Sequence, residues 1–300
     1  MTINISHAEL SRADLPRANL SRAKTLVAAV AVVAAGALGS GPAHAASVTS
    51  ENWVTRPDVL NRVLVMKPDQ PTGAVMLLPG GHGNINLDAQ SRVGWGEDDF
   101  LLRTRMRYAN GGLLAIVPDV AADHKPPVSL AGFRTSPMQA DDLHALADRL
   151  LGMTPKVWIV AYDSGATSAL NAAARGKTDT IAGLVLISPM LEEPEPASSM
   201  LIDGAKLALA NLPVLLISHE SDSCSRPTVD RIKNAAAALK APNFQSITVR
   251  GGSEQFAVSD PFEYPEDSCN TQAHHALAGR EGVVSRDVID WIDRQSAAAK

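Results

Sequence analysis

Residues 157–167 join an apolar run typical of a buried strand to an alanine-rich run, continuing to Arg175, that is typical of a helix. Between the two runs, small residues stand two positions before and two positions after Asp163, at Ala161 and Gly165. A very tight strand-to-helix turn needs small residues at those positions, and it presents the side chain at its tip as a nucleophile. The spacing therefore predicts that the carboxylate of Asp163 is the reactive group of such a turn.

A turn with Ser164 at its tip is the alternative register. It would place Tyr162 and Ala166 at the two small positions, and the tyrosine side chain would collide with the crossing of strand and helix. The plainer interpretation is a helix N-cap, because Asp and Ser are both good caps. This interpretation is compatible with a nucleophile at the tip. A helix N-terminus favours an anion, so we expect Asp163 to be ionised at neutral pH.

A second segment of interest follows the apolar run 212–218 and contains Glu220 and Asp222. Where a nucleophile of this kind is followed along the chain by an acid and then by a histidine, the acid lies just past a later strand and orients the histidine. We predict that Asp222 is this acid, with Glu220 as the second choice. An ordinary turn or helix cap built from Asp and Ser is the alternative.

The candidate base must lie further along the chain, and His274 and His275 are the only histidines that follow the acid. We predict that His275 is the base, and a solvent-facing histidine pair or a helix cap is the alternative. Cys224 follows Asp222 by two residues, and Cys269 precedes His274 by five. Two lone cysteines usually pair in an oxidising compartment. A Cys224–Cys269 disulfide would therefore join the acid loop to the histidine loop.

A glycine-rich turn, residues 79–84, directly follows the continuous apolar run 74–78. Such a turn lets backbone N–H groups point into a cleft, where they can stabilise a developing oxyanion. We predict an oxyanion hole formed by Gly81 and His82 together with Ser164. A phosphate-binding loop is disfavoured because the lysine and the Ser/Thr of that motif are missing, and a plain turn remains the other alternative.

The elements that must position these residues alternate along the chain. Apolar runs predict strands at 61–66, 74–78, 113–117, 157–161, 181–187, 212–218 and 244–250. Helical spacing predicts helices at 98–108, 139–151, 167–175, 227–239 and 279–295, and a possible helix at 200–210. The proline-containing segments 121–135 and 191–199 are predicted to be loops. Alternating strands and helices predict the α/β class: a mostly parallel sheet with helices on both faces and a crevice at the carboxyl ends of its strands.

The first 45 residues have the pattern of a secretory signal peptide. Four basic residues precede residues 26–38, an uncharged apolar run of 13 residues that is too short to span a bilayer, and residues 43–45 offer an Ala-x-Ala cleavage site. A membrane anchor is the alternative. We therefore predict an exported protein, periplasmic or secreted, with residues 46–300 as a single domain that has little or no cap.

Composition limits the class of partner. The formal net charge is −5, and it becomes −7 without the four basic and two acidic side chains of residues 1–45, which argues against nucleic acid. The two cysteines lack the CxxC spacing of a zinc site, so we expect no metal, and no motif indicates a cofactor. The rest of the chain has no apolar run of 18 residues, so we expect no other membrane span. We expect a small-molecule ligand.

The chain resembles the α/β-hydrolase superfamily through residues 77–83 and 161–165 together with Asp222 and His275. More loosely, it resembles a group of small exported members with a Gly-Phe-Arg-Thr-Ser stretch, here residues 132–136, and one cysteine after the acid and one before the histidine. The resemblance covers residues 54–292 and implies the fold. Members of that group carry Ser where this chain has Asp163, and usually Gly where it has Ala161.

Three functional hypotheses follow from an aspartate at the tip. In the first, Asp163 attacks an sp³ carbon and the resulting alkyl-enzyme ester is hydrolysed with the help of His275, as the resemblance to epoxide hydrolases and haloalkane dehalogenases implies. In the second, Asp163 prevents acyl transfer, and the protein is a degenerate hydrolase that binds a small molecule. In the third, Ser164 performs ordinary ester hydrolysis.

Overall fold

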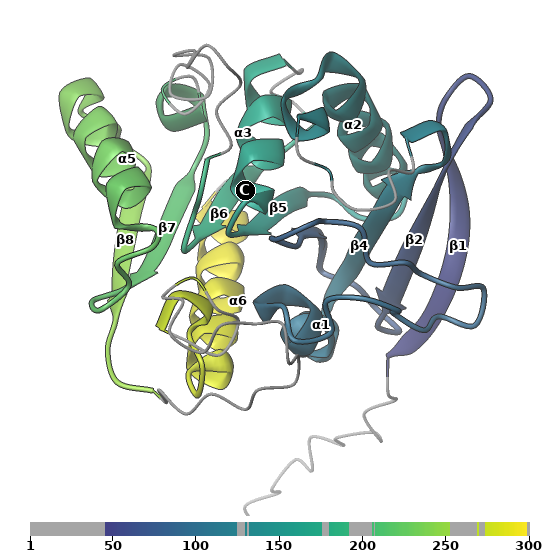
Figure 1. Cartoon of the computed structure of the whole chain (residues 1–300), viewed down its shortest axis with the longest axis horizontal. Helices are drawn as coiled ribbons and strands as arrows, with labels where there is room; N and C mark the ends of the chain where they lie inside the picture. The colour runs from purple at the N-terminus through teal and green to yellow at the C-terminus, as the bar shows by residue number, and fades with distance from the viewer. Residues whose placement is uncertain are drawn as a thin grey trace, which may run out of the picture. The chain divides into compact units, whose positions relative to one another are not determined.

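The computed structural model of the chain describes residues 46–124, 130, 132–175, 180–191, 206, 208–252, 269 and 274–298. Residues His44–Lys300 form one compact unit, built around an eight-stranded sheet (Figure 1). The predicted signal peptide, the predicted loop at 191–199 except its first residue, and most of the possible helix at 200–210 lie outside the described residues. The signal peptide and the size of any cap therefore stay predictions.

The sheet is mixed, with an antiparallel edge and a parallel body. Its order is β1-β2-β4-β3-β5-β6-β7-β8. The strands are β1 (Ser47–Arg56), β2 (Val59–Lys67), β3 (Gly73–Leu78), β4 (Leu113–Ala121), β5 (Val157–Tyr162), β6 (Gly183–Ile187), β7 (Val214–His219) and β8 (Phe244–Val249). The pairs β1–β2 and β2–β4 are antiparallel, and the other five pairs are parallel.

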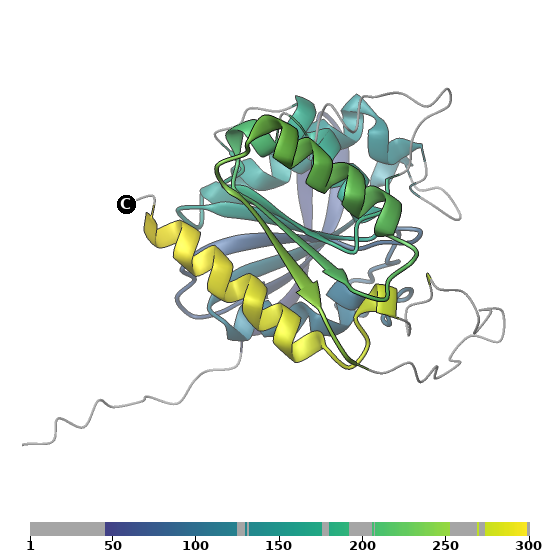
Figure 2. The same ribbon diagram turned by 90° about the vertical axis from the view of Figure 1, so that its left-hand side faces the viewer.

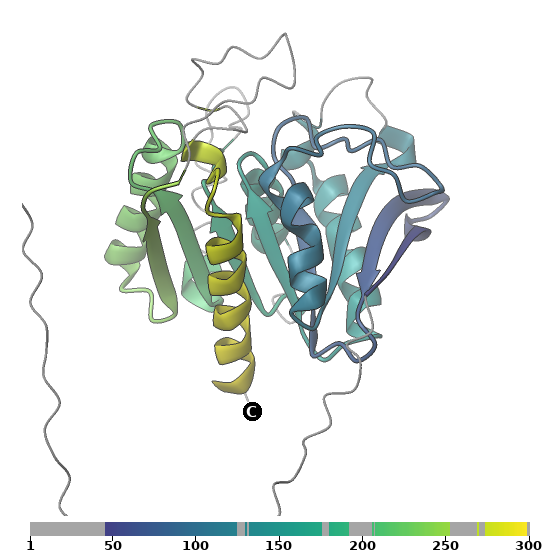
Figure 3. The same cartoon turned by 90° about the horizontal axis from the view of Figure 1, so that it is seen from below.

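Helices cover both faces of the sheet (Figures 2 and 3). One face carries α2 (Pro137–Leu151), α3 (Gly165–Arg175) and α5 (Arg226–Leu239), and the other carries α1 (Phe100–Asn110) and α6 (Glu281–Ala298). Successive strand residues serve opposite faces, so Ile159 of β5 packs in the core under α2, α3 and α5, whereas Val160 packs in the core under α1 and α6. The predicted fold class is confirmed.

The central parallel strands match their predicted positions because both of their faces are covered. Every residue of β3, β5, β6 and β7 is buried, which explains why these strands read as continuous apolar runs. β1 was not predicted, because only Trp53 of its ten residues is buried and it forms a half-solvated edge. The predicted end of β4 at residue 117 is wrong: β4 continues to Ala121, and Pro118 is tolerated where the pairing with β2 shifts register.

The turn between β5 and α3 leaves no room for a side chain at its second small position. A Cβ atom on Gly165 would lie 2.2 Å from the carbonyl oxygen of Leu78 and 2.8 Å from that of Pro79. Both atoms belong to the backbone of the neighbouring β3 strand and its loop, so neither can move away cheaply. The requirement for a small residue thus arises from the close approach of α3 to the end of β3.

We expect Gly165→Ala to lower the free energy of unfolding by about 2 kcal/mol or more, because the added methyl group overpacks a rigid backbone contact. Gly73→Ala is the matched control, since its Cβ would meet its nearest neighbour at an ordinary 3.6 Å, and it should change the stability by less than about 1 kcal/mol. Urea denaturation followed by circular dichroism measures both. Equal stabilities for the two variants would contradict the steric account of the turn.

Candidate active site

Asp163 stands at the tip of the turn between β5 and α3. Its backbone has a left-handed φ of 51°, whereas Ser164 does not share this conformation. The Asp163 N–H donates to the carbonyl oxygen of Ile187 on the adjacent β6 strand at 3.1 Å, and the Asp163 carbonyl oxygen accepts the N–H of Ala166 at 3.1 Å. Left-handed backbone is uncommon for residues other than glycine and is found at strained, functional turns. The turn therefore holds the Asp163 side chain in a fixed direction.

The three residues predicted as nucleophile, acid and base lie in one chain of contacts. Nε2 of His275 is 3.3 Å from Oδ1 of Asp163, and Nδ1 of His275 is 3.1 Å from Oδ2 of Asp222. His275 is 1% exposed, so it is not part of a solvent-facing histidine pair. The structure thus brings together side chains that are 53 and 112 residues from the histidine in sequence.

Asp222 is fixed at the start of α5. Its Oδ1 accepts the backbone N–H groups of Cys224 and Ser225 at 2.9 Å and 3.1 Å, and its Oδ2 accepts the Ser225 hydroxyl. Backbone donors at a helix N-terminus stabilise the ionised carboxylate. Glu220, the second choice for the acid, instead pairs with Arg250 at 3.1 Å.

The predicted disulfide is confirmed. Cys224 and Cys269 are bonded, with their Cα atoms 5.3 Å apart. Cys224 also donates its N–H to Asp222, so the bridge is anchored in the loop that carries the acid. Its other end is five residues before η3 (His274–Ala276), the single turn that carries His275. The bridge therefore ties together two segments that must meet for the acid to reach the imidazole.

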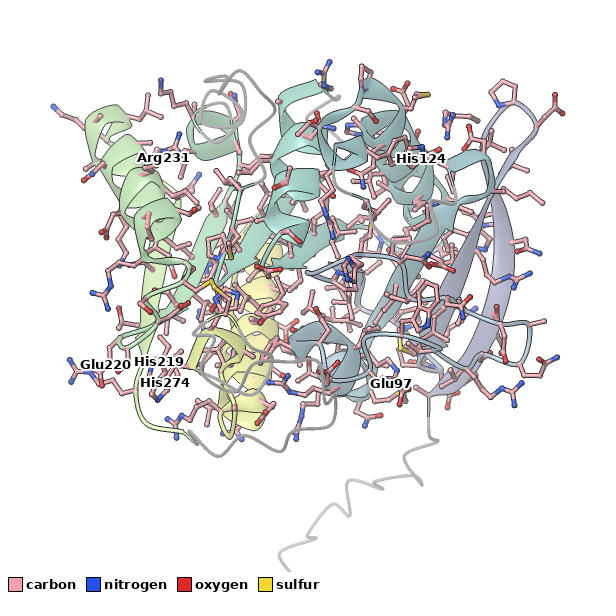
Figure 4. The ribbon with its side chains drawn as sticks, viewed as in Figure 1. Glu97, His124, His219, Glu220, Arg231 and His274 are labelled. Carbon is pink, nitrogen blue, oxygen red and sulfur yellow. A yellow bond between two sulfur atoms is a disulfide. The ribbon has the colours of Figure 1, made fainter. Side chains whose placement is uncertain are left out.

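The turn η3 is also held by contacts that were not predicted. The ring of His274 stacks on the ring of His219, with centroids 4.2 Å apart and planes 7° from parallel. The two residues are labelled next to each other in Figure 4. His219 is the last residue of β7, and its Nε2 lies 2.8 Å from the carbonyl oxygen of Gly251. Arg103 of α1 donates to the carbonyl oxygen of Ala276. Together, these contacts fix the residues before and after His275, and therefore the position of His275.

Competition between burial and pairing sets the protonation states of Asp163, Asp222 and His275, which we call the trio. Burial disfavours every charged form, which raises the pKa of a carboxyl group and lowers that of an imidazole. Hydrogen bonds and opposite charges within the trio outweigh burial. They lower the pKa of Asp163 to about 2 and the pKa of Asp222 below its usual value, and they raise the pKa of His275 to about 9. At neutral pH the trio is an imidazolium between two carboxylates.

Of the backbone donors predicted for an oxyanion hole, that of Gly81 points at Asp163 itself. The Gly81 N–H donates to Oδ2 of Asp163 at 2.8 Å, and the backbone N–H of Ser164 also helps to lower the pKa of this carboxyl group. Ser164 uses its hydroxyl to donate to the carbonyl oxygen of Gly81 at 3.1 Å, rather than to His275. His82 is exposed and makes no hydrogen bond to Asp163 in the described structure, and its carbonyl oxygen accepts the N–H of Leu130.

Asp99 is a member of the site that sequence reasoning missed. It caps α1 by accepting the N–H of Leu101 at 2.7 Å through Oδ1, while its Oδ2 accepts the N–H of Gly80 at 2.9 Å. Burial raises the pKa of Asp99 to about 6. An aspartate before an apolar helical run is a recognisable cap, but its second role, holding the glycine-rich loop 19 residues earlier, has no local signal.

Among the residues that the structure describes, no three His, Cys, Asp or Glu side chains gather in a way that would hold a metal ion. Within the same part of the chain, no helix is both long enough and apolar enough to cross a lipid bilayer.

Comparison with known proteins identifies the fold. No protein-family model matches the sequence, and the search of curated proteins found no match. The structure of a dienelactone hydrolase from Anabaena variabilis is similar, with a TM-score of 0.56 and 15% identity over 84% of this chain and 99% of that one. The esterase Pf2001 from Pyrococcus furiosus has a TM-score of 0.56 and 12% identity, over 84% of this chain and 93% of the esterase.

The dipeptidyl peptidase 4 of Porphyromonas gingivalis is similar over part of its length. Its TM-score is 0.54 at 14% identity, and the match covers 83% of this chain but only 36% of the peptidase. At sequence identities this low, a structural match shows a shared architecture but not a shared activity. With the strand order and the two helical layers, these matches show that the chain has the α/β-hydrolase fold.

Proposed function

We propose that this protein is an exported hydrolase of small molecules in which Asp163 is a covalent nucleophile. One observation carries the proposal: the two oxygens of the Asp163 carboxylate have different partners. Oδ2 accepts the Gly81 N–H at 2.8 Å, and Oδ1 lies 3.3 Å from Nε2 of His275. One oxygen is thus placed where an oxyanion would form, and the other is placed beside the acid-base group.

A carboxylate in this position suits attack at an sp³ carbon. Attack on an ester carbonyl would give a mixed anhydride, whereas attack on an sp³ carbon gives an ester that water can cleave. Ser164 is not the nucleophile in this proposal, because its hydroxyl is engaged with the carbonyl oxygen of Gly81. Epoxides fit best, because opening the ring releases an alkoxide that needs a proton, and the imidazolium of His275 has one to give.

The first step forms the covalent intermediate. Oδ1 of Asp163 attacks a ring carbon of the epoxide, so that a carbon–oxygen bond to Asp163 forms and a ring carbon–oxygen bond breaks. The proton on Nε2 of His275 goes to the alkoxide oxygen. The products are a hydroxyalkyl ester of Asp163 and a neutral imidazole, which remains oriented by Asp222 at 3.1 Å.

The second step regenerates the enzyme. With Asp163 esterified, one negative neighbour of His275 is lost, so its pKa falls and the neutral imidazole can accept a proton from water. The water oxygen attacks Cγ of Asp163, and the N–H groups of Gly81 and Ser164 stabilise the oxyanion. Collapse breaks the ester bond, the diol leaves with the proton from His275, and the carboxyl proton of Asp163 passes back to the imidazole.

A ligand-binding protein without turnover is the second candidate. The observation in its favour is that the carboxylate of Asp163 already accepts the hydrogen bond of the Gly81 N–H. The oxyanion of an ordinary ester substrate would need this donor. In this case the aspartate would be an inactivating replacement for serine, and the protein would bind a small molecule without changing it.

Turnover by four proteins separates the hypotheses: wild type, Asp163→Ala, Asp163→Ser and Ser164→Ala, on styrene oxide and on p-nitrophenyl acetate. We expect Asp163→Ala to lower epoxide turnover at least about 1,000-fold, because it removes the nucleophile, and Ser164→Ala to retain it within about tenfold. Ester hydrolysis that appears only in Asp163→Ser, with no epoxide turnover by wild type, would instead support the binding protein. Loss of ester hydrolysis in Ser164→Ala, with activity retained in Asp163→Ala, would support Ser164 as the nucleophile.

The protonation state of His275 gives a test that needs no substrate. We expect the ¹³C-labelled imidazole of His275, assigned with His275→Gln, to titrate near pH 9 in wild type and at a lower pH in Asp163→Asn, which lacks one carboxylate charge. The raised pKa stabilises the fold fully below pH 6.5, the ordinary value for histidine, and this stabilisation is lost as the pH rises through about 9.

Raising the pH from 6.5 to about 9 should therefore lower the free energy of unfolding more in wild type than in Asp163→Asn. A wild-type midpoint at or below 6.5, or a midpoint that Asp163→Asn leaves unchanged, would show that the imidazole is not held between two carboxylates.

A further inference from the structure

Arg134 lies beneath the glycine-rich loop, far from it in sequence. It belongs to the single turn η2 (Phe133–Thr135) and is 1% exposed. Its Nη2 donates to the carbonyl oxygens of three consecutive loop residues: Pro79 at 3.3 Å, Gly80 at 3.4 Å and Gly81 at 3.1 Å. Its Nη1 donates to the Ser168 hydroxyl on α3 at 3.2 Å. One guanidinium group thus connects the loop to the helix that follows Asp163.

These contacts determine where the Gly81 N–H points. In a trans peptide the C=O and the N–H are directed oppositely. The carbonyl oxygen of Gly80 accepts from Arg134 and also from the Gly83 N–H at 3.1 Å. Because this oxygen is held on the side of Arg134, the N–H of the same peptide, which belongs to Gly81, must point the other way. It points to Oδ2 of Asp163, 2.8 Å away.

The loop is shaped to accept the guanidinium. Gly83 has a φ of +69°, and a Cβ atom there would lie 2.5 Å from Nη2 of Arg134. On the opposite side, Asp99 accepts the Gly80 N–H at 2.9 Å. The loop is therefore held between a cation that binds its carbonyl oxygens and an anion that binds one of its N–H groups.

Packing alone does not explain an arginine at this position. Burying a guanidinium group is costly, and a buried apolar side chain of similar length would fill the space more cheaply. The loop atoms that Arg134 contacts are three consecutive carbonyl oxygens. Arginine has a planar fork of donors that can reach several acceptors at once, and this is what fixing the orientation of consecutive peptides requires.

We propose that Arg134 is a positioning residue for the site: it orients the Gly80–Gly81 peptide so that the Gly81 N–H is directed at the carboxylate of Asp163. The importance of this orientation for turnover rests on the proposed function, since the same N–H stabilises the oxyanion during hydrolysis of the Asp163 ester. The orientation itself is a property of the resting protein and can be measured without a substrate.

Amide hydrogen exchange of Gly81 is the direct readout. Glycine-selective ¹⁵N labelling of the full chain resolves the glycine amides, and loss of one signal in Gly81→Ala assigns Gly81. We expect Arg134→Met to raise the exchange rate of the Gly81 amide at least about tenfold, because the hydrogen bond to Asp163 is no longer enforced. Arg134→Lys, which keeps the charge but not the fork, should raise it by a smaller factor.

Arg56→Met is the matched control for removing a largely buried arginine. Arg56 pairs with Asp142 and Asp123, each at 2.8 Å, and does not contact the loop. We expect this control to lose stability without changing Gly81 exchange. If Arg134→Met does not fold, Arg134→Lys decides. A Gly81 exchange rate within about twofold of wild type, in whichever Arg134 variant folds, overturns the proposal.

Kinetics on styrene oxide then separate this inference from the proposed function. We expect Arg134→Met to lower kcat between about tenfold and about 100-fold with KM nearly unchanged, as for loss of an oxyanion donor, and Arg56→Met to keep kcat within about threefold. If wild type shows no turnover, the proposed function fails while the exchange result still decides the role of Arg134. Faster Gly81 exchange with unchanged kcat would overturn the link to catalysis.

Discussion

The central interaction of this structure is a buried imidazolium held between two carboxylates. His275 is 1% exposed, and a charge at such a site would be expelled without partners on both of its nitrogens. Asp222 and Asp163 supply those partners at 3.1 Å and 3.3 Å. The disulfide, the His219–His274 stack and the N-terminus of α5 all act on this trio, because each fixes a segment that carries one of its members. The arrangement also makes the acid-base state of His275 depend on the charge of Asp163.

Backbone geometry supplies the second constraint, which acts on Asp163. The residue has a left-handed φ of 51°, and Gly165 behind it has no space for a Cβ atom. The turn therefore aims one carboxylate oxygen at the glycine-rich loop and the other at His275. Asp99 and Arg134 hold that loop from opposite directions, so the Gly81 N–H meets the carboxylate. The site combines a rigid anion, a backbone donor and a charged imidazole, and these are the groups that the proposed formation and hydrolysis of an Asp163 ester would use.

The features predictable from sequence were those with a local or periodic signal. The buried parallel strands read as apolar runs because both faces are covered, and the turn at Asp163 was recognisable because small residues flank it at Ala161 and Gly165, the second of which has no space for a Cβ atom. Cys224 and Cys269 could be paired because there are no other cysteines. Arg134 and Asp99 act on a loop that is distant in sequence, so no spacing rule identifies their roles. β1 was missed because a strand at a solvated edge has little apolar pattern to detect.

The most direct test of a covalent Asp163 is a single turnover in H₂¹⁸O, with enzyme in excess over styrene oxide, followed by mass spectrometry of the diol and of the peptide containing Asp163. If Asp163 attacks the substrate and water then attacks its ester, the first diol contains no ¹⁸O and the carboxylate of Asp163 gains the label. Label in the first diol, with none in the Asp163 peptide, would mean that water attacks the substrate directly, and the account of Asp163 as nucleophile would be wrong.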